Sequence, residues 1–409
     1  MRDLSRQGGR RQGLVQRLER DRGLNMWRAL AGGLLLGIAL GGCTGSDTNF
    51  SQYQGFAEYF TAHPPRRQSP TVEERVLLAQ YRPRFLLPPG HAGLVDFYRD
   101  YIAEGTLYDG EGEPIAGHVT PEILNAHKRE PNVRFVHRPD FAKPTSAVVY
   151  GRIDHDTVDL GKVGRMPFTF LSYHAVFRAS GLPAGFNGWR AAALGLIADL
   201  DDWHQLDHYT AATLALDKTL KPVALMLQQH NYHHTYVFGK DLALPADGRP
   251  LVDVAIRSNE LYPHRAGRSV RPAVRFLDPQ ALRYLMGFAD EPTVAAPDIT
   301  EGVNEAEYRL EFLPPDDAFY TFQGFLGERR ALPGRDGPPG ADYNTLPELK
   351  PLGLQLLAGF WRENDGDDLA RFEASYAKTN DERDFARAQA AVFAAAIQHS
   401  ADCKSMAVC

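Results

Sequence analysis

The sequence predicts an α+β fold, in which a central antiparallel β-sandwich carries helical additions at its N-terminal and C-terminal ends. Apolar and β-branched runs separated by turn residues crowd residues 145–280, and this spacing is typical of short strands in a sandwich. Helical periodicity with capping signals occurs on both sides of that region. The hydrophobic content of 44% and the aromatic content of 11% are those of a globular chain rather than a disordered one.

A secretory signal region, residues 1–42, precedes the part that we expect to fold. From Met26 the chain reads MWRALAGGLLLGIALGGC, which is a basic residue, an apolar run, two glycines and then Cys43. This ending resembles a bacterial lipoprotein signal, which implies that Cys43 is lipidated; the alternative is a plain signal peptide in which Cys43 has no role. The apolar run is too short to span a bilayer as a helix, which needs roughly 20 residues. We expect residues 1–25, which are rich in arginine, to be a mis-assigned extension ahead of the true start.

The charge of the remaining chain limits its partners. Residues 1–42 carry eight arginines and three acidic residues, so the remainder has 37 basic and 48 acidic residues and a net charge of −11. This balance argues against nucleic acid or a bare anionic membrane as the main partner. We therefore expect membrane attachment through the lipidated N-terminus alone. Because Thr44 rather than an aspartate follows Cys43, we expect the periplasmic face of the outer membrane.

Helices are expected in the N-terminal segment, residues 69–140, after a polar tether at 43–68. Thr71 and Glu74 form a capping box ahead of the apolar residues Val72, Val76 and Leu77. A second helix is expected over 92–104, where apolar residues share one face and Gly105 ends the helix.

Strands are expected throughout the sandwich domain, residues 145–280. The runs that predict them are SAVVYGRI, PFTFLSYHAVFR, YTAATLAL, PVALMLQQHNYHHTYVFG and PLVDVAI. The stretch WRAAALGLIADL, residues 189–200, interrupts these runs and predicts a helix.

The C-terminal segment, residues 281–409, is expected to hold loops and helices. Helices are predicted near 348–362 and 367–377, and a last helix is capped by Thr379 and Glu382, with Phe393 on its apolar face. In an oxidising compartment Cys403 and Cys409 can form a disulfide; the alternative is two free thiols.

No common catalytic signature is present, since the sequence has no P-loop, dinucleotide-binding, nucleophile-elbow or zinc-protease motif. The candidate functional residues come instead from three polar clusters in the sandwich domain. The first, ADLDDWHQLDHY, holds Asp199, Asp201, Asp202, Trp203, His204 and His208.

The first cluster can place metal ligands side by side. In a strand, Asp202, His204 and His208 share one face and Trp203 lies on the other. Asp199 and Asp201 can add oxygens, and such a mixed site suits Mg²⁺, Ca²⁺ or Mn²⁺ more than Zn²⁺. If the preceding helix continues instead, His204 and His208 form a zinc-type pair. A solvated loop with a structural tryptophan remains the third alternative.

The second and third clusters follow predicted strands. His230 ends a buried strand and is a metal ligand candidate, with His233 and His234 as ligand-binding candidates. The alternative is one buried histidine and two exposed ones. The third cluster, RSNELYPH, follows a strand ending at Ile256 and offers Asn259 and Glu260 for ligand binding.

The order of these clusters resembles the vacuolar protein sorting 62 family and the related necrosis- and ethylene-inducing peptide-like proteins. The matching positions, all within 145–275, are Asp202, Trp203, Gln229, His230, Ser258, Tyr262 and Pro263. The resemblance implies a jelly-roll-like β-sandwich with a divalent cation at one end that binds glycosylated lipid head groups.

Four positions depart from the family pattern. His204 stands where the family has glutamate, Asn259 where it has histidine, Arg257 where it has glycine, and Asp199 or Asp201 where a histidine precedes the tryptophan motif. The fold can therefore carry over where the metal chemistry does not.

The sequence favours a cell-envelope lipoprotein whose polar, cation-dependent site binds a glycan or glycolipid head group. One alternative is a metal-dependent hydrolase at the same site, in which the metal activates water and a histidine transfers protons. The other is a structural lipoprotein without a ligand. Of these, the non-enzymatic interpretations are preferred. The candidate cofactor is a divalent cation, Ca²⁺, Mg²⁺ or Mn²⁺ rather than Zn²⁺, and the alternative is that the protein has no cofactor.

Overall fold

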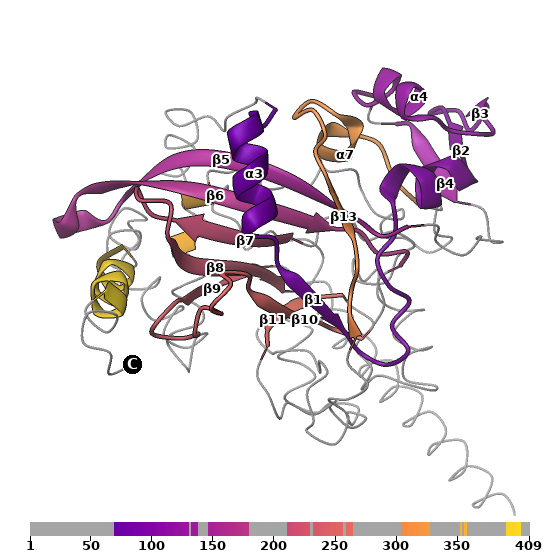
Figure 1. Cartoon of the computed structure of the whole chain (residues 1–409). Coiled ribbons are helices and arrows are strands. Elements are labelled where there is room, and N and C mark those ends of the chain that lie inside the picture. The colour runs from indigo at the N-terminus through magenta and orange to yellow at the C-terminus, as the bar shows by residue number, and fades with distance from the viewer. Residues whose placement is uncertain are drawn as a thin grey trace, which may run out of the picture.

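The computed structural model describes residues 69–130, 132–137, 146–179, 211–229, 232–256, 259–264, 304–327, 352–353, 356–357 and 390–401. This part of the chain is a mixed α/β structure made mostly of strands in several sheets, with few and short helices (Figure 1).

The elements have the following bounds. The strands are β1 (Arg84–Leu87), β2 (Gly105–Tyr108), β3 (Pro114–Ala116), β4 (Arg134–His137), β5 (Val148–Asp159), β6 (Arg165–Ala175), β7 (Ala211–Leu216), β8 (Pro222–Gln229), β9 (Tyr232–Val237), β10 (Leu251–Val254), β11 (Leu261–Pro263), β12 (Asn304–Glu305) and β13 (Arg309–Glu311). The helices are α3 (Val72–Gln80), the π-helix η2 (Phe97–Tyr101), the 3₁₀ turns η3 (Ile102–Glu104) and η4 (Gly161–Val163), α4 (Pro121–Ala126) and α7 (Ala318–Thr321).

The described strands form three sheets. The largest has the order β13-β5-β6-β7-β8-β9, and the strands from β5 to β9 follow one another as an antiparallel meander. The second has the order β11-β10-β1-β12, with β1 parallel to β10. The third is small and has the order β3-β2-β4.

One hydrophobic cluster joins the six-stranded and four-stranded sheets. Successive side chains of a strand point to opposite faces, so alternate residues in the central parts of β5 to β9 enter this cluster. The six-stranded sheet contributes Val149, Ile153, Leu171, Leu214 and Leu227, and the four-stranded sheet contributes Phe85, Val252, Val254 and Leu261. Helix α3 adds the buried Leu78, whose carbonyl accepts a hydrogen bond of 2.9 Å from the Tyr173 hydroxyl.

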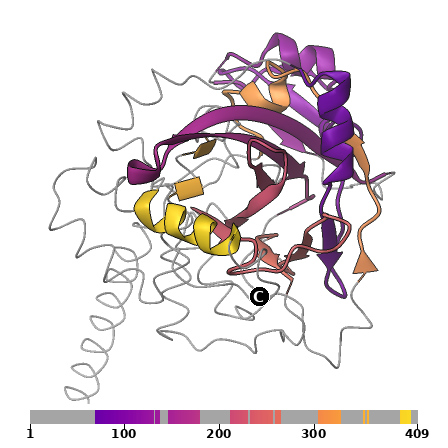
Figure 2. The same ribbon diagram turned by 60° about the vertical axis from the view of Figure 1, so that its left-hand side comes forward.

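The opposite face of the six-stranded sheet carries two further clusters with polar residues between them. Tyr150 belongs to the cluster that includes η2, α7 and the small sheet, and Phe168 belongs to the one that includes the C-terminal helical residues 390–401, yellow in Figure 2. Between them, Arg152 and Asp154 form a buried ion pair of 2.8 Å. The pair satisfies two charges that would be costly to bury singly.

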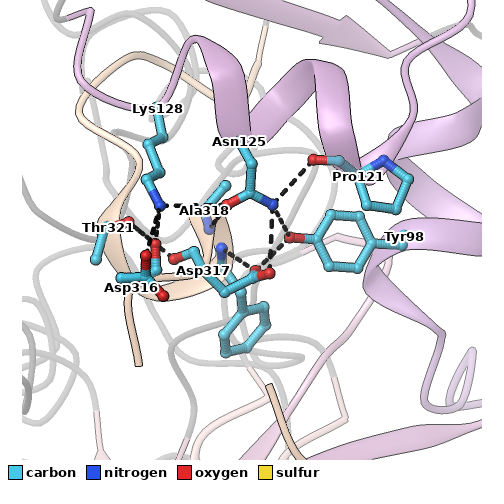
Figure 3. Close-up of polar contacts among 9 residues, drawn as sticks. Tyr98, Pro121, Asn125, Lys128, Asp316, Asp317, Ala318 and Thr321 are labelled. Carbon is cyan, nitrogen blue, oxygen red and sulfur yellow. Dashed lines mark hydrogen bonds and ion pairs between the residues drawn. The ribbon is translucent and has the colours of Figure 1, made fainter. Parts of the chain in front are cut away.

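A polar network joins η2, α4 and α7 (Figure 3). The Tyr98 hydroxyl donates to Asp317, whose side chain also caps the N-terminus of α7 by accepting from the Phe319 amide. The Asn125 side chain accepts from the Ala318 amide at 2.9 Å and donates to Asp317 at 3.3 Å. Burial and the Asp317 charge raise the pKa of Tyr98 well above its usual value, so this hydroxyl remains a neutral donor.

The predicted capping box of the first helix is confirmed, because Thr71 and Glu74 bond each other's backbone amides. Of the apolar residues named there, Leu77 packs against the main hydrophobic cluster, whereas Val72 and Val76 are exposed and the fully buried residue is Leu78. The helix rests on the sheet through its C-terminal half, and that contact cannot be read from local periodicity.

The helix predicted over 92–104 is replaced by the single turns η2 and η3. Gly90 and Gly93 adopt positive φ angles of 85° and 90°, and Leu94 pairs with Phe177 as an isolated bridge. The Asp96 side chain then caps η2 by accepting hydrogen bonds from the Tyr98 and Arg99 amides. The tertiary pairing therefore keeps the start of this segment extended and shortens the helix.

The predicted strands between 145 and 280 are present as β5 to β10, and β11 lies where the sequence predicted only an exit turn. The described part of β8 extends to Gln229, next to the predicted strand end at His230. The strand expected to end at Ile256 ends at Val254. The helix predicted at 189–200 and the one at 367–377 lie outside the described residues. Of the other two C-terminal helices, the structure describes helical residues at 352–353, 356–357 and 390–401.

The flanking segments differ from the helical and loop segments expected there. Residues 69–140 contribute β1 to the four-stranded sheet, and 281–409 contribute β12 to the same sheet and β13 to the six-stranded one. These strands have two to four residues, and distant segments supply their partners. Strands this short have too few residues for an alternating pattern to reveal them.

We predict that Tyr98→Phe destabilises the protein by about 1–3 kcal/mol, because buried Asp317 loses a hydrogen-bond donor. The measurement is the free energy of unfolding in urea. The control is Tyr108→Phe in β2, since the Tyr108 hydroxyl forms no hydrogen bond with the described residues. An equal loss of unfolding free energy in both variants would contradict a stabilising role for the hydrogen bond from Tyr98 to Asp317.

Candidate functional site

Four strand ends meet at one edge of the six-stranded sheet. Ala175 ends β6, Ala211 begins β7, Gln229 ends β8 and Tyr232 begins β9, and antiparallel pairing brings these ends into neighbouring positions. The Ala211 amide donates to the Gln228 side chain at 3.3 Å across this edge. We call it the motif edge, because the sequence clusters at 199–208 and 230–234 adjoin it.

The third cluster lies in the hairpin of β10 and β11. Its connection closes with a hydrogen bond of 2.9 Å from the Ala255 amide to the Glu260 carbonyl. Asn259 is buried and has a φ of 61°, in the left-handed region that asparagine tolerates better than most residues.

The Asn259 side chain joins this connection to the motif edge. Its Nδ2 donates to the Ala179 carbonyl at 2.9 Å, four residues beyond the end of β6. Its Oδ1 lies 3.1 Å from Nε2 of His91. The connection between β10 and β11, which we call the Asn259 corner, is therefore hydrogen-bonded both to the residues that follow β6 and to the loop that carries His91.

His91 reaches Asn259 because β1 and β10 are parallel. Parallel strands end at the same side of a sheet, so the residues after Leu87 and those after Val254 leave together. The His91 loop then runs back along the β6 exit, where the Val95 amide donates to the Val176 carbonyl at 2.9 Å.

The electrostatic state of His91 follows from its surroundings. The Gly93 amide donates to Nδ1 at 2.9 Å, so Nδ1 carries a lone pair and Nε2 carries the hydrogen that is donated to Asn259. The ring also meets the edge of Phe177 at 5.4 Å between centroids. Burial lowers the pKa of His91 from 6.5 to about 4, although the bond to Asn259 acts in the opposite direction. His91 is thus neutral at neutral pH.

Two acidic residues are buried on the other face of the β10–β11 hairpin. The Asp253 carboxylate lies 2.8 Å from Nδ1 of His264, which is hydrogen-bond distance and becomes an ion pair when the histidine is charged. The Glu260 carboxylate accepts a hydrogen bond from the Tyr262 hydroxyl. Asp253 and Tyr262 are cross-strand partners and hence lie on the same face. This arrangement can bind a proton or position a polar ligand through groups with defined hydrogen bonds.

The predicted ligand-binding residues of the second cluster fall on β9. His234 is buried on the same face as Tyr236, with ring centroids 6.3 Å apart, and pairs across the strands with Leu227. His233 is the backbone partner of Gln228. His234 thus belongs to the face that packs on the main hydrophobic cluster rather than to an open surface.

The other predicted site residues lie outside the described residues. They are the metal candidates Asp199, Asp201, Asp202, His204 and His230, the ligand candidate His208, the lipidation candidate Cys43 and the disulfide candidates Cys403 and Cys409. Within the described ranges, no group of three or more His, Cys, Asp or Glu side chains could hold a metal ion. No helix in these ranges is long and apolar enough to cross a membrane.

Comparisons with known proteins give little further information. No family model matches the chain, and no curated protein matches it. A solved structure titled "Toxin fold for microbial attack and plant defense" aligns with 58% of this chain and 91% of its own length, at 15% identity and a TM-score of 0.25. A likeness at this TM-score carries no argument about this chain.

Sequence reasoning missed His91, Asp253 and His264. His91 stands in PPGHAG, where prolines and glycines indicate a loop but no partner. Its significance comes from Asn259, which is 168 positions away along the chain. The alternation of Asp253 with apolar neighbours was visible, and a polar residue inside a predicted strand could have marked it for attention.

We predict that Asn259→Gly destabilises the protein by about 1–2 kcal/mol, because two side-chain hydrogen bonds are lost while the left-handed backbone remains favourable. Asn259→Ala should cost about 1 kcal/mol more, since alanine disfavours this φ. Urea unfolding measures both. Leu220→Gly is the control for backbone strain: exposed Leu220 has the same φ of 61°, so glycine should be neutral or stabilising there. Equal unfolding energies for the two Asn259 variants would contradict the strain argument.

Proposed function

We propose that this protein is a cell-envelope lipoprotein that binds a glycan or glycolipid head group at the motif edge, with the help of a divalent cation. One observation carries the proposal. The described residues that flank the three sequence clusters all lie at the same end of the fold. These residues are Ala179 and Ala211 for the first cluster, Gln229 and Tyr232 for the second, and Asn259 for the third.

The convergence matters because a binding site needs polar groups from several segments at one place. The segment that carries Asp202 and His204 leaves from Ala179 and returns at Ala211, and the Asn259 side chain bonds the first of these two residues directly. His230 stands between the described ends of β8 and β9. Connections between strands at one end of a rigid sheet are a common location for ligand-binding groups.

The proposed cation would be held by carboxylate oxygens and imidazole nitrogens. Asp199, Asp201 and Asp202 would supply the oxygens, and His204 and His230 the nitrogens, a set that suits Ca²⁺, Mg²⁺ or Mn²⁺ better than Zn²⁺. Asn259 and Glu260 would then supply polar groups from the hairpin side, with His208 and His233 as further ligand-binding groups, while His234 would support the site from the buried face of β9. Sugar hydroxyl groups bind well to such a mixture of amide, carboxylate and metal.

The proposed fold is a jelly-roll-like β-sandwich of the kind found in the vacuolar protein sorting 62 and necrosis-inducing families. Two sheets that share one hydrophobic cluster support it, as does the order of the motif residues from Asp202 to Pro263. The proposed anchor is lipidated Cys43 at the periplasmic face of the outer membrane, and the signal-like sequence ahead of it supports that assignment.

We predict that the full-length protein, purified in detergent without a histidine tag, contains close to one divalent cation per chain. Asp202→Ala and His230→Ala should each lose it, because each removes a ligand. The exposed His118→Ala is the matched control and should retain the metal. Elemental analysis after dialysis against Ca²⁺, Mg²⁺, Mn²⁺ and Zn²⁺ in turn is the measurement.

The same four proteins would then be applied to an array of envelope glycans. Binding by wild type and His118→Ala, with loss in the two site variants at an unchanged unfolding midpoint, supports the proposal. Wild-type protein that binds neither cation nor glycan refutes it and favours a structural lipoprotein. A preference for Zn²⁺ together with ester or phosphoester hydrolysis would instead favour a metal-dependent hydrolase.

A further inference from the structure

We propose that His91 is a positioning residue of this site: in its neutral form it holds Asn259 and the exit of β6 together, and protonation releases them. The consequence for ligand binding rests on the function proposed above. The structural part does not, because it concerns hydrogen bonds that the described residues make with one another.

The direction of each hydrogen bond is fixed by the chemistry of the partners. The Gly93 amide can only donate, so Nδ1 of His91 must accept. Nε2 then carries the hydrogen and donates to Oδ1 of Asn259, and Nδ2 of Asn259 donates to the Ala179 carbonyl. We call this series the His91 hydrogen-bond chain. Its three bonds, of 2.9, 3.1 and 2.9 Å, all run in one consistent direction.

Protonation is incompatible with this chain. A charged imidazole carries hydrogens on both nitrogens, so Nδ1 would face the Gly93 amide as one donor against another. Loss of that bond frees the His91 loop, and Asn259 loses the partner that orients its amide. The hydrogen bond from Asn259 to the Ala179 carbonyl is then weakened. Ala179 directly precedes the segment that carries Asp199 to His208, so this weakening would affect the start of that segment.

Among the residues that the structure describes, no carboxylate forms a hydrogen bond or an ion pair with His91 that would stabilise its charged form. Two titratable groups lie on the adjoining elements. Glu260 accepts a hydrogen bond from the Tyr262 hydroxyl, and the charge of Arg178 is stabilised by Asp100. Burial lowers the pKa of His91, and the hydrogen bond to Asn259 raises it. Desolvation is therefore not offset by a carboxylate of the described part of the chain, and His91 resists protonation for as long as the His91 hydrogen-bond chain is closed.

The pH window follows from linkage. The pKa of His91 is about 4 in the closed form and near 6.5 when the ring is released into water. The open form binds more protons between these values, so closure is fully favoured above pH 6.5 and is lost as the pH falls toward 4. At pH 4.5 the opening equilibrium should rise by up to about 70-fold relative to pH 7.5.

The test is hydrogen exchange of full-length protein at pH 7.5 and pH 4.5, corrected for the intrinsic exchange rate. In wild type, we expect protection of peptides covering 88–95, 176–179 and 255–260 to fall at least about tenfold at pH 4.5. His91→Gln retains an Nε2 donor for Asn259 but cannot become charged, so its protection should change little with pH. The exposed His118→Gln is the matched control and should behave as wild type.

A second measurement does not depend on any variant folding well. Nitrogen-15 NMR of labelled histidines in wild type should show one ring with hydrogen on Nε2 and a pKa near 4. A His91 ring that titrates near 6.5, or an Nδ1 hydrogen at neutral pH, overturns the proposal. So does equal acid sensitivity of wild type and His91→Gln in the exchange experiment.

Calcium binding separates this inference from the proposed function. Titration of Ca²⁺ alone into wild type and His91→Gln at pH 7.5 and pH 5.5 should show a larger loss on acidification in wild type. If wild type binds no Ca²⁺ at pH 7.5 while the exchange and NMR results are as expected, the proposed cation site fails and the positioning role of His91 stands. If both proteins lose Ca²⁺ equally, His91 does not control the site.

Discussion

Burial of the six-stranded sheet on both faces is the constraint on which the rest of this structure depends. One face shares a hydrophobic cluster with the four-stranded sheet, and the other carries two clusters with the Arg152–Asp154 ion pair between them. Because a shift by one residue would exchange the two faces, the register of β5 to β9 is strongly specified. That register in turn fixes which residues end the strands, and so which segments meet at the motif edge.

The parallel pairing of β1 with β10 is the second determinant of the site. It sends the residues after Leu87 and those after Val254 out at the same side, where His91 and Asn259 meet. Neutral groups with fixed donor and acceptor roles make this junction, whereas the proposed cation ligands are carboxylates and histidines. Separating a neutral framework from charged ligands allows the framework to keep its geometry while the charged groups bind or release a ligand.

The sequence predicted the local features of the described structure well where a local pattern was strong. The capping box at Thr71 and the end of β8 before His230 follow from side-chain chemistry and alternation. It failed where distant segments act: the expected helix over 92–104 became two single turns because Leu94 pairs with Phe177. For the site, Asn259 was identified from the motif order, but His91 carries no motif and becomes visible only through its contact.

By itself, the sequence determined that this is a strand-rich globular chain with polar clusters following several of its strands. Period-two alternation and turn residues are local properties, and they suffice for that. Only the tertiary structure decided that β1, β12 and β13 complete the two large sheets. It also decided that His91, Asn259 and Ala179 form one hydrogen-bond chain. The physical reason is that hydrogen bonds between distant segments depend on strand direction and register, which short segments do not specify on their own.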